Sequence, residues 1–378
     1  MTIFIEPFRK PNEHMTFLVS LLYGELAQNK KVVFYATTDY YNSIPEEFRN
    51  KIEFREIKSP NSSSDLIFKI IKLTISILRK YKKEPGVKLF LLSSRAYSNI
   101  FLKIHSLFFI KRVPVFVFLH GELQHLMAKK SLSHRLDGLA QLILYKVDSV
   151  FKSNYKFVVI SEFVYEKLCL SVNSALPNFI SMDLPYYYGE EMSKSSTEIS
   201  SGLTISTVGV NSLNKNSHYL NFIAEAFSKE IINEQLKLFI IGRNENIEFH
   251  DLIDVPDLGK HHLLDPEAYS KRILQSDLLV FFNEDNKYNL ISSGSYFDCI
   301  KYRKPMIALK NTQWEYNFNK FGVIGKLFDN IDEMNDFIKN ILYNKELITP
   351  YYEKLDQARN NSDIVVNIQK YAEKFQEE

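Results

Sequence analysis

The amino-acid sequence predicts an α/β protein with two doubly wound domains, each built on a parallel sheet. Three observations lead to this fold class. The chain has 378 residues, more than one hydrophobic core usually supports. Short apolar runs alternate with longer segments of helical periodicity, which is typical of parallel strands covered by helices on both faces. The alternation stops once, in a small polar stretch, and then starts again.

The first half contains five apolar runs that predict strands. They are Thr2–Ile5, Lys31–Ala36, Lys88–Leu92, Val113–Leu119 and Phe157–Ile160, and we expect the last to close the series. Apolar residues at helical spacing predict helices between these strands, at His14–Gln28, Asp65–Lys83, Tyr97–Phe109 and Leu132–Asp148.

The second half repeats this pattern. Strands are predicted at Leu203–Val208, Leu236–Ile241, Leu278–Phe282 and Met306–Leu309, and helices at Ser217–Lys229, Pro266–Gln275 and Ser295–Tyr302. The tail from about Ile331 to Phe375 is predicted to be helical.

The break in the alternation sets the expected domain organisation. We expect a first domain over 1–188, a linker over 189–202, a second domain over 203–360 and a C-terminal helix over 361–378 that packs back on the first domain. A cleft between two such domains is the default place for a ligand.

Composition excludes several classes of protein. The formal net charge is +2, which argues against a dedicated nucleic-acid binder. Residues 1–180 carry 26 Lys and Arg against 15 Asp and Glu, whereas the rest carries 21 against 30, so the halves differ in sign. Two cysteines, Cys169 and Cys299, cannot form a disulfide framework. With no signal peptide and no apolar run of about 18 residues, we expect a cytoplasmic protein.

One segment of the second half has the features of a phosphate site. Ser293, Gly294 and Ser295 precede a predicted helix, and Asp298 lies one turn inside it. The first N–H groups of a helix are unpaired and attract phosphate, and a carboxylate one turn later can accept both hydroxyls of a ribose. A serine that only caps the helix is the structural alternative.

Two cations follow neighbouring strands of the same domain. Gly209 leads to Lys215 after one strand, and Gly242-Arg243 follows the next. The carboxyl ends of parallel strands are where ligands bind in such sheets, so these cations could neutralise a diphosphate.

These segments resemble the GT-B glycosyltransferases, especially those with a glycogen-synthase-like donor domain. Gly209, Lys215 and Gly242 match that family's glycines and lysine, and Asp298, seven residues before Pro305, falls on its ribose-binding Glu. Other matches are Ser276–Phe281 in the donor domain, and Phe118-Leu119-His120, Val158–Ser161 and Leu176-Pro177-Asn178 before the linker. The resemblance implies a GT-B fold, with two Rossmann-like domains facing across a cleft, and His120 beside the donor sugar.

The chain departs from the family pattern at two positions. Val210 stands where the family has an arginine for the diphosphate, and Leu290 stands where it has a first glutamate. Arg243 is a candidate for the missing cation. No Asp-x-Asp occurs in the chain, and the resemblance implies catalysis without a metal or another cofactor.

Base candidates should follow strands of the first domain. One loop carries Glu13 before the first helix, and another carries His120 and Glu122 after the strand Val113–Leu119. If the enzyme inverts the configuration of the sugar, Glu122 is our first choice for the base that takes the acceptor proton. Glu13 could equally be an acid that complements the helix dipole.

The predicted helix Asp65–Lys83 has a basic face formed by Lys69, Lys72, Arg79, Lys80 and Lys83. A solvated helix face is one interpretation. The other is a surface for anionic lipid headgroups, extended by Lys103, Lys111 and Arg112.

Together these features predict an enzyme that moves a sugar from a nucleotide diphosphate sugar to a glycan or lipid-linked glycan, in bacterial surface polysaccharide synthesis, as the resemblance implies. The expected location is the cytoplasm or the inner face of the membrane. A non-catalytic GT-B-like partner subunit is the alternative. An NAD-dependent enzyme is disfavoured because no Gly-x-Gly-x-x-Gly follows a predicted strand.

Overall fold

The computed structural model describes most of the chain, namely residues 1–60, 62–108, 113–120, 123, 126, 132–150, 154–173, 176, 178–183, 186–189, 202–256, 264–285, 290 and 292–376. Internal contacts divide it into two compact units. Unit 1 comprises Met1–Tyr187, Leu290–Ser292 and Asn367–Glu378, and unit 2 comprises Tyr188–Asn289 and Ser293–Val366. The predicted linker falls mostly on residues 190–201, outside the described part.

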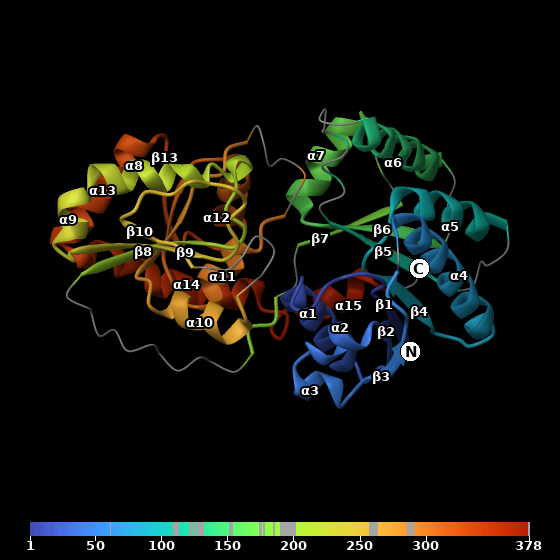
Figure 1. The fold of residues 1–378 in the computed structure, drawn as a ribbon. Coiled ribbons are helices and arrows are strands. Elements are labelled where there is room, and N and C mark those ends of the chain that lie inside the picture. Colours follow the sequence, from blue (N-terminus) through green and yellow to red (C-terminus); the bar gives the residue numbers. More distant parts are fainter. Residues whose placement is uncertain are drawn as a thin grey trace. The chain divides into compact units, whose positions relative to one another are not determined.

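Unit 1 is built on a seven-stranded sheet in the order β3-β2-β1-β4-β5-β6-β7. Every neighbouring pair is parallel. The strands are β1 (Thr2–Ile5), β2 (Val32–Ala36), β3 (Glu53–Glu56), β4 (Lys88–Leu91), β5 (Val115–Leu119), β6 (Tyr155–Ile160) and β7 (Phe179–Met182). The helices are α1 (Met15–Leu26), α2 (Thr38–Asn42), α3 (Glu46–Arg49), α4 (Ser63–Tyr81), α5 (Ala96–Phe108), α6 (Leu132–Val150), α7 (Glu162–Val172) and α15 (Ile368–Lys374) (Figure 1).

Unit 2 has a six-stranded parallel sheet in the order β10-β9-β8-β11-β12-β13. Its strands are β8 (Leu203–Val208), β9 (Leu236–Ile241), β10 (Ile253–Asp254), β11 (Leu278–Phe281), β12 (Met306–Leu309) and β13 (Gly325–Phe328). Its α-helices are α8 (Leu220–Ala226), α9 (Ser228–Ile232), α10 (Pro266–Leu274), α11 (Ser295–Lys301), α12 (Thr312–Phe321), α13 (Ile331–Tyr343) and α14 (Pro350–Ser362). Three short 3₁₀ helices, η2 (Leu213–Lys215), η3 (Ser217–Tyr219) and η4 (Lys345–Ile348), complete it.

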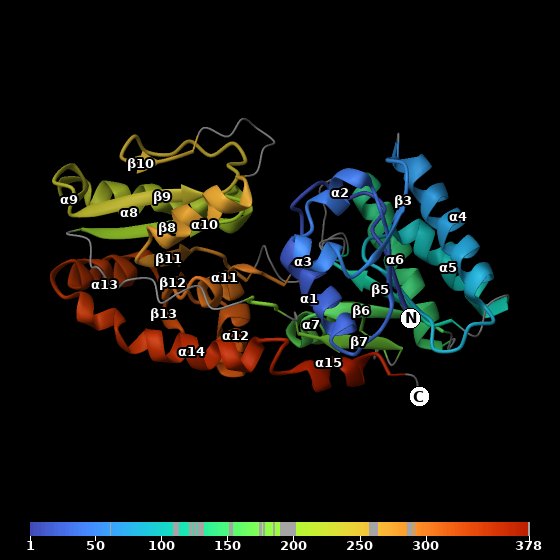
Figure 2. The same cartoon turned by 90° about the horizontal axis from the view of Figure 1, so that it is seen from below.

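Each sheet has one point where its winding reverses. In unit 1 the chain winds from β1 outward to β3 and then crosses to β4, on the other side of β1. Because crossovers between parallel strands are right-handed, α1 and the helices α4 to α6 lie on opposite faces (Figures 1 and 2). The loops after β1 and β4 lie side by side at the carboxyl ends of these strands, and the Ser93 hydroxyl joins them by donating to Glu6. In unit 2 the same reversal lies between β8 and β11.

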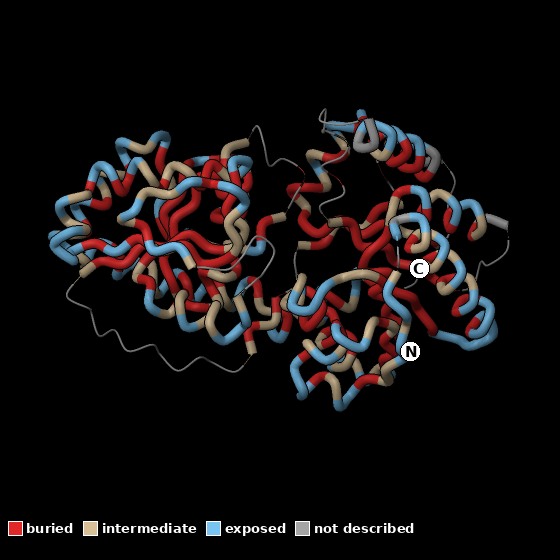
Figure 3. Tube along the Cα trace, in the orientation of Figure 1, coloured by how far each residue is buried: buried red, intermediate tan, exposed pale blue. Residues whose placement is uncertain are grey.

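The core of each unit lies on its sheet, where the buried trace follows the strands (Figure 3). All four residues of β1, β4, β11 and β12 are buried. In unit 1 the rings of Phe4, Phe90 and Phe116 meet edge to face at centroid distances of 5.1 and 5.4 Å. Each such contact stabilises the fold by about 0.5–1.5 kcal/mol beyond the contribution of the buried area itself.

The structure contains strands that the sequence pattern does not predict. The strand β3 has the sequence Glu-Phe-Arg-Glu, which contains no apolar run and therefore does not predict a strand. Its charged residues are tolerated because β3 lies at the edge of the sheet, where they are partly exposed. The first series does not close at β6, because the short edge strand β7 follows it. The predicted helix Ser217–Lys229 is divided into η3, α8 and the beginning of α9.

Glu25 joins distant parts of unit 1 through buried polar contacts. Its carboxylate pairs with Lys88 of β4 at 2.7 Å and accepts hydrogen bonds from the hydroxyls of Thr2 in β1 and Tyr371 in α15. Burial lowers the pKa of Lys88 to about 8, against the raising effect of Glu25. Removing one partner of such a pair leaves a buried charge and costs about 3–5 kcal/mol.

A glycine allows α15 to approach α1. At Gly24 an added Cβ would overlap the ring of Tyr371, which is buried. Phe375, just after α15, also packs against Phe90 and Phe116 at ring distances of 4.9 and 5.2 Å. Residues after the last helix of unit 2, from Asn367 on, therefore belong to unit 1, and Phe375 lies in its core.

We predict that Gly24→Ala destabilises the full chain by about 1–3 kcal/mol, because a methyl group must displace the Tyr371 ring. Denaturant unfolding measures this free energy. The matched control is Gly294→Ala, because Gly294 has a φ of −70° and an added Cβ there meets no atom of a described residue within 4 Å. Equal stability of the two variants would contradict this account of α15.

Candidate functional site

The first set of candidate residues lies in unit 2, where two glycine loops meet. Gly209 follows β8 with a φ of 85°, and Gly242 follows β9 with a φ of 124°. The Gly209 N–H donates to Ile241 O at 2.8 Å. A Cβ at Gly242 would overlap the backbone of Gly209. Close approach of the two loops therefore requires glycine at 242, and a left-handed backbone favours it at 209.

Lys215 ends the turn that follows Gly209. A Cβ built on Gly209 would lie 3.8 Å from Lys215 Nζ, so the amino group lies above the glycine loop. The next residue, Asn216, has a left-handed φ of 53°, and its amide donates to Phe282 O at 3.2 Å. This contact ties the turn to the loop after β11. The half-buried amino group of Lys215 thus lies at the point where the winding of unit 2 reverses.

Asp298 lies close enough to Lys215 to affect its ionisation. Burial lowers the pKa of Lys215, and the carboxylates of Glu245 and Asp298 oppose this shift. Asp298 stands in the first turn of α11 and accepts a hydrogen bond from the Tyr269 hydroxyl at 3.1 Å. The fold therefore places Lys215 above Gly209, and the charge of Asp298, 83 positions after Lys215 in the chain, acts on the same amino group.

The start of α11 is open. Ser293 is buried, and its hydroxyl accepts from the N–H of Ser295 at 3.4 Å. Gly294 has an ordinary right-handed backbone, so its flexibility is not needed for the turn, and the space beside its Cα is empty of described atoms within 4 Å. Because α11 has only seven residues, its dipole contributes less to the attraction of an anion than the charge of Lys215 does.

Arg243 already has an acidic partner. Its Nη2 forms an ion pair with Glu245, and its buried Nε has no hydrogen-bond partner in the described part of the chain. To contact a diphosphate, Arg243 would have to exchange Glu245 for the ligand. Of the two departures from the family pattern, Leu290 is buried and Val210 is half-buried.

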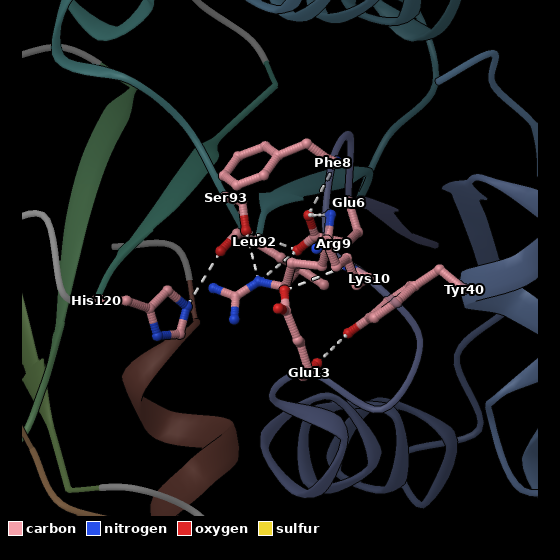
Figure 4. Close-up of polar contacts among 9 residues, drawn as sticks. All are labelled: Glu6, Phe8, Arg9, Lys10, Glu13, Tyr40, Leu92, Ser93 and His120. Atoms are coloured by element: carbon pink, nitrogen blue, oxygen red, sulfur yellow. Dashed lines mark hydrogen bonds and ion pairs between the residues drawn. The ribbon is translucent and has the colours of Figure 1, made fainter. Parts of the chain in front are cut away.

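A second cluster lies in unit 1, at the carboxyl ends of β1 and β4 (Figure 4). Glu6 is buried and pairs with Arg9 Nε at 3.0 Å. The Ser93 hydroxyl donates to Glu6 at 2.7 Å and accepts from Arg9 Nε at 2.7 Å. Burial raises the pKa of Glu6, whereas Arg9 and these hydrogen bonds lower it. No sequence motif indicates this triad, although Glu6 and Ser93 directly follow predicted strands.

His120 follows β5 and reaches the same cluster. Its Nε2 lies 3.1 Å from Leu92 O. Since a carbonyl oxygen only accepts, Nε2 carries the hydrogen, and Nδ1 of a neutral ring keeps a lone pair. Burial, and then Arg9 and His14, hold the pKa of His120 well below its ordinary value, which favours this neutral form. The rings of His14 and His120 meet edge to face at 4.9 Å.

The remaining base candidates are placed differently. Glu13 precedes α1 and accepts from the Lys10 N–H at 3.2 Å, and its backbone carbonyl accepts from the Tyr40 hydroxyl at 3.0 Å (Figure 4). It lies in the loop before the helix and not in the first turn. Glu122 lies outside the described residues.

The prediction that Lys103 extends the basic surface is wrong. Lys103 is buried under α6 and forms an ion pair with Asp148, because α5 packs against α6. Lys72, Arg79, Lys80 and Lys83 are exposed, whereas Lys69 is half-buried and pairs with Asp65 at 2.8 Å. Lys111 and Arg112 lie outside the described residues.

The described part of the chain has neither a metal site nor a membrane-spanning helix. Within it, no group of three or more His, Cys, Asp and Glu side chains could hold a metal ion. No described helix is long and apolar enough to cross a membrane.

Comparison with known proteins identifies the fold. By sequence, no family and no curated protein matches the chain. Among solved structures, HepE (Alr3699) of Anabaena, determined in complex with UDP and glucose, is 13% identical, with 98% of each chain covered and a TM-score of 0.64. WaaG, a glycosyltransferase involved in lipopolysaccharide biosynthesis, is 12% identical over 99% of each chain, with a TM-score of 0.62.

A glycosyltransferase from Rickettsia africae is 12% identical over 98% of this chain and 96% of that chain, with a TM-score of 0.60. At these identities the similarity concerns the fold. The predicted fold class, two Rossmann-like domains of the GT-B kind, is confirmed.

We predict that the affinity of the chain for pyrophosphate falls at high pH because Lys215 loses its proton. The pKa of Lys215 is lowered, so the loss should begin at a lower pH than for an exposed lysine. Calorimetric titrations between pH 7 and 10 measure this affinity.

Lys215→Arg is the matched control for the pH titration. Its guanidinium stays charged over the whole range, while the ligand's own titration is common to both proteins. Identical pH profiles for the two proteins would remove Lys215 from the anion site.

Proposed function

We propose that the protein is a glycosyltransferase that moves a sugar from a nucleotide diphosphate sugar to a glycan or lipid-linked glycan acceptor. The observation that carries this proposal is the position of Lys215 Nζ above the Gly209 loop at the winding reversal of unit 2. The charge of Asp298 acts on the same amino group. The fold supports the proposal, because HepE, which has the same fold, was solved with UDP and glucose.

The proposed donor site assigns one task to each residue. Lys215 neutralises the diphosphate, and the open loop at Ser293, Gly294 and Ser295 admits it. Asp298 accepts the ribose hydroxyls, with Tyr269 holding its second oxygen. Arg243 also contacts the diphosphate, once its ion pair with Glu245 is broken. Stabilising the departing diphosphate matters most, since negative charge accumulates there as the bond to the sugar breaks.

In the reaction, the acceptor oxygen forms a bond to the anomeric carbon while the bond from that carbon to the diphosphate oxygen breaks. The acceptor proton passes to a base, for which Glu122 is our first choice and Glu13 the alternative. His120 contacts the reacting sugar through Nδ1, which can accept a hydroxyl hydrogen. We propose that the chain's own cations, without a metal or another cofactor, stabilise the leaving diphosphate.

We further propose that the enzyme works at a membrane surface, in the assembly of bacterial surface polysaccharide. The resemblance to GT-B enzymes and the similarity to WaaG support this setting. A feature of unit 1 also supports it. The neighbouring helices α4, α5 and α6 leave seven large apolar side chains exposed, namely Phe68, Tyr97, Phe101, Ile104, Leu136, Leu139 and Ile143.

Exposed bases accompany this apolar surface. They are Lys72, Arg79 and Lys80 on α4, and Arg135 and Lys146 on α6. Apolar side chains flanked by Lys and Arg fit the interface of an anionic bilayer, where each base contributes about 1 kcal/mol.

A non-catalytic partner subunit is the second candidate function. Val210 and Leu290 favour it, because they replace two charged residues of the family pattern. A partner subunit of this kind should bind no nucleotide sugar.

We predict that a thermal-shift screen of UDP, GDP, CMP and their sugars finds one stabilising class. In Asp298→Ala its affinity should fall about tenfold, or 1–2 kcal/mol, for the loss of a charge-assisted hydrogen bond. The control is Asp254→Ala, an exposed carboxylate that pairs with Arg272. If no compound in the screen stabilises the protein, the result favours the partner subunit. Unchanged affinity in Asp298→Ala would exclude Asp298 from the nucleotide site.

We predict that the protein cosediments with vesicles containing an anionic phospholipid and not with neutral vesicles. Phe101→Ser combined with Leu139→Ser should abolish most of this binding, since it removes apolar area from two neighbouring helices. The control is Ile232→Ser, an exposed apolar residue of unit 2. If the double variant binds as the wild type does, α5 and α6 are not the contact surface.

A further inference from the structure

Arg9 lies where the winding of unit 1 reverses, between the loops after β1 and β4. The side chain is only 8% exposed. Its Nε is fully engaged, because it contacts Glu6 at 3.0 Å and Ser93 at 2.7 Å. The two Nη groups make no hydrogen bond or ion pair with any described residue. Figure 4 shows this end of the guanidinium turned toward His120.

The triad fixes the direction of Arg9. One Glu6 oxygen accepts from the N–H groups of Phe8 and Arg9, and the other from Ser93 and Arg9 Nε. Both oxygens of Glu6 are thus engaged, and Glu6 contacts the guanidinium of Arg9 only at Nε. The opposite edge of the guanidinium, with the two Nη groups, is left unoccupied. A guanidinium that only tied the loop together would not need to present four N–H donors away from its partner.

The surroundings of the Nη groups suit an anion. The helix α1 begins at Met15, and its N-cap residue His14 makes no side-chain cap, so the first N–H groups of the helix have no capping side chain. Arg95, after β4, stacks on Phe8 at 5.3 Å and forms no ion pair in the described part of the chain. The loop after β1 therefore carries the open edge of Arg9, and the loop after β4 carries a second cation, Arg95.

We propose that Arg9 and its surroundings form a subsite for an anionic group, phosphate or carboxylate, of the glycosyl acceptor. The inference rests on the proposed function, which assigns the nucleotide to unit 2. The donor diphosphate has its own cations there, Lys215 and Arg243, whereas Arg9 lies in unit 1. The planar Nη pair matches two oxygens of a phosphate or carboxylate, a geometry that lysine cannot supply.

The test compares charged and neutral sugars as probes. The full chain is titrated with glucose 6-phosphate, glucuronate and glucose, both alone and with the nucleotide from the screen at saturation. We expect the wild type to bind at least one charged sugar about tenfold more tightly than glucose. This preference should shrink as salt is raised, and Arg9→Gln should abolish it.

Two variants and one measurement keep the result interpretable. Arg9→Lys keeps the charge without the fork and should retain only part of the preference. Lys10→Gln, an exposed neighbour, should retain all of it. If Arg9→Gln does not fold, the salt dependence of the wild type and the Arg9→Lys comparison still decide the matter.

The outcomes separate this inference from the proposed function. Equal binding of charged and neutral sugars by the wild type overturns it, even if the nucleotide binds normally. A loss of nucleotide affinity in Arg9→Gln comparable to that in Asp298→Ala also overturns it, because Arg9 would then serve the donor. If no nucleotide binds but the charged sugar is still preferred, the proposed function fails and the anion subsite remains.

Discussion

The parallel direction of every strand pair in both sheets is the constraint on which the rest of the structure depends. Parallel strands need a crossover for each connection, and right-handed crossovers place the helices on both faces. All carboxyl ends then lie at one edge of each sheet. Where the winding reverses, loops that belong to opposite directions of winding lie side by side, and polar side chains can gather there without disturbing the core. Both candidate clusters lie at such points.

Buried charge has two different roles in unit 1. The pairs Glu25–Lys88 and Lys103–Asp148 are enclosed between a helix and the elements that it packs against, and they hold those elements in place. Arg9 also has a buried acidic partner, but its contacts leave one edge of the guanidinium open. A buried ion pair is weak evidence for stability. An ion pair that orients an unoccupied donor group is better evidence for a binding site.

The charge imbalance between the two halves of the chain has a structural explanation only in part. Of the basic excess in the first half, Lys88 and Lys103 are internal and neutralised by acidic partners. The bases that remain exposed on α4 and α6 accompany apolar side chains on the same helices. Net charge alone therefore does not distinguish a membrane-facing surface from a structural pair, since each residue's burial decides its role.

The sequence by itself determined the fold class, most of the strands, and the glycine and lysine spacing of the proposed donor site. These signals are local: a strand or helix is recognised from the period of its own side chains. Tertiary structure alone decided that Glu6, Arg9 and Ser93 meet, that Lys103 is buried, and that Tyr371 reaches Glu25. Such contacts join residues tens to hundreds of positions apart, and strand order sets which of them come together. The charged edge strand β3 was missed for a related reason, because its partner β2, and not its own pattern, makes it a strand.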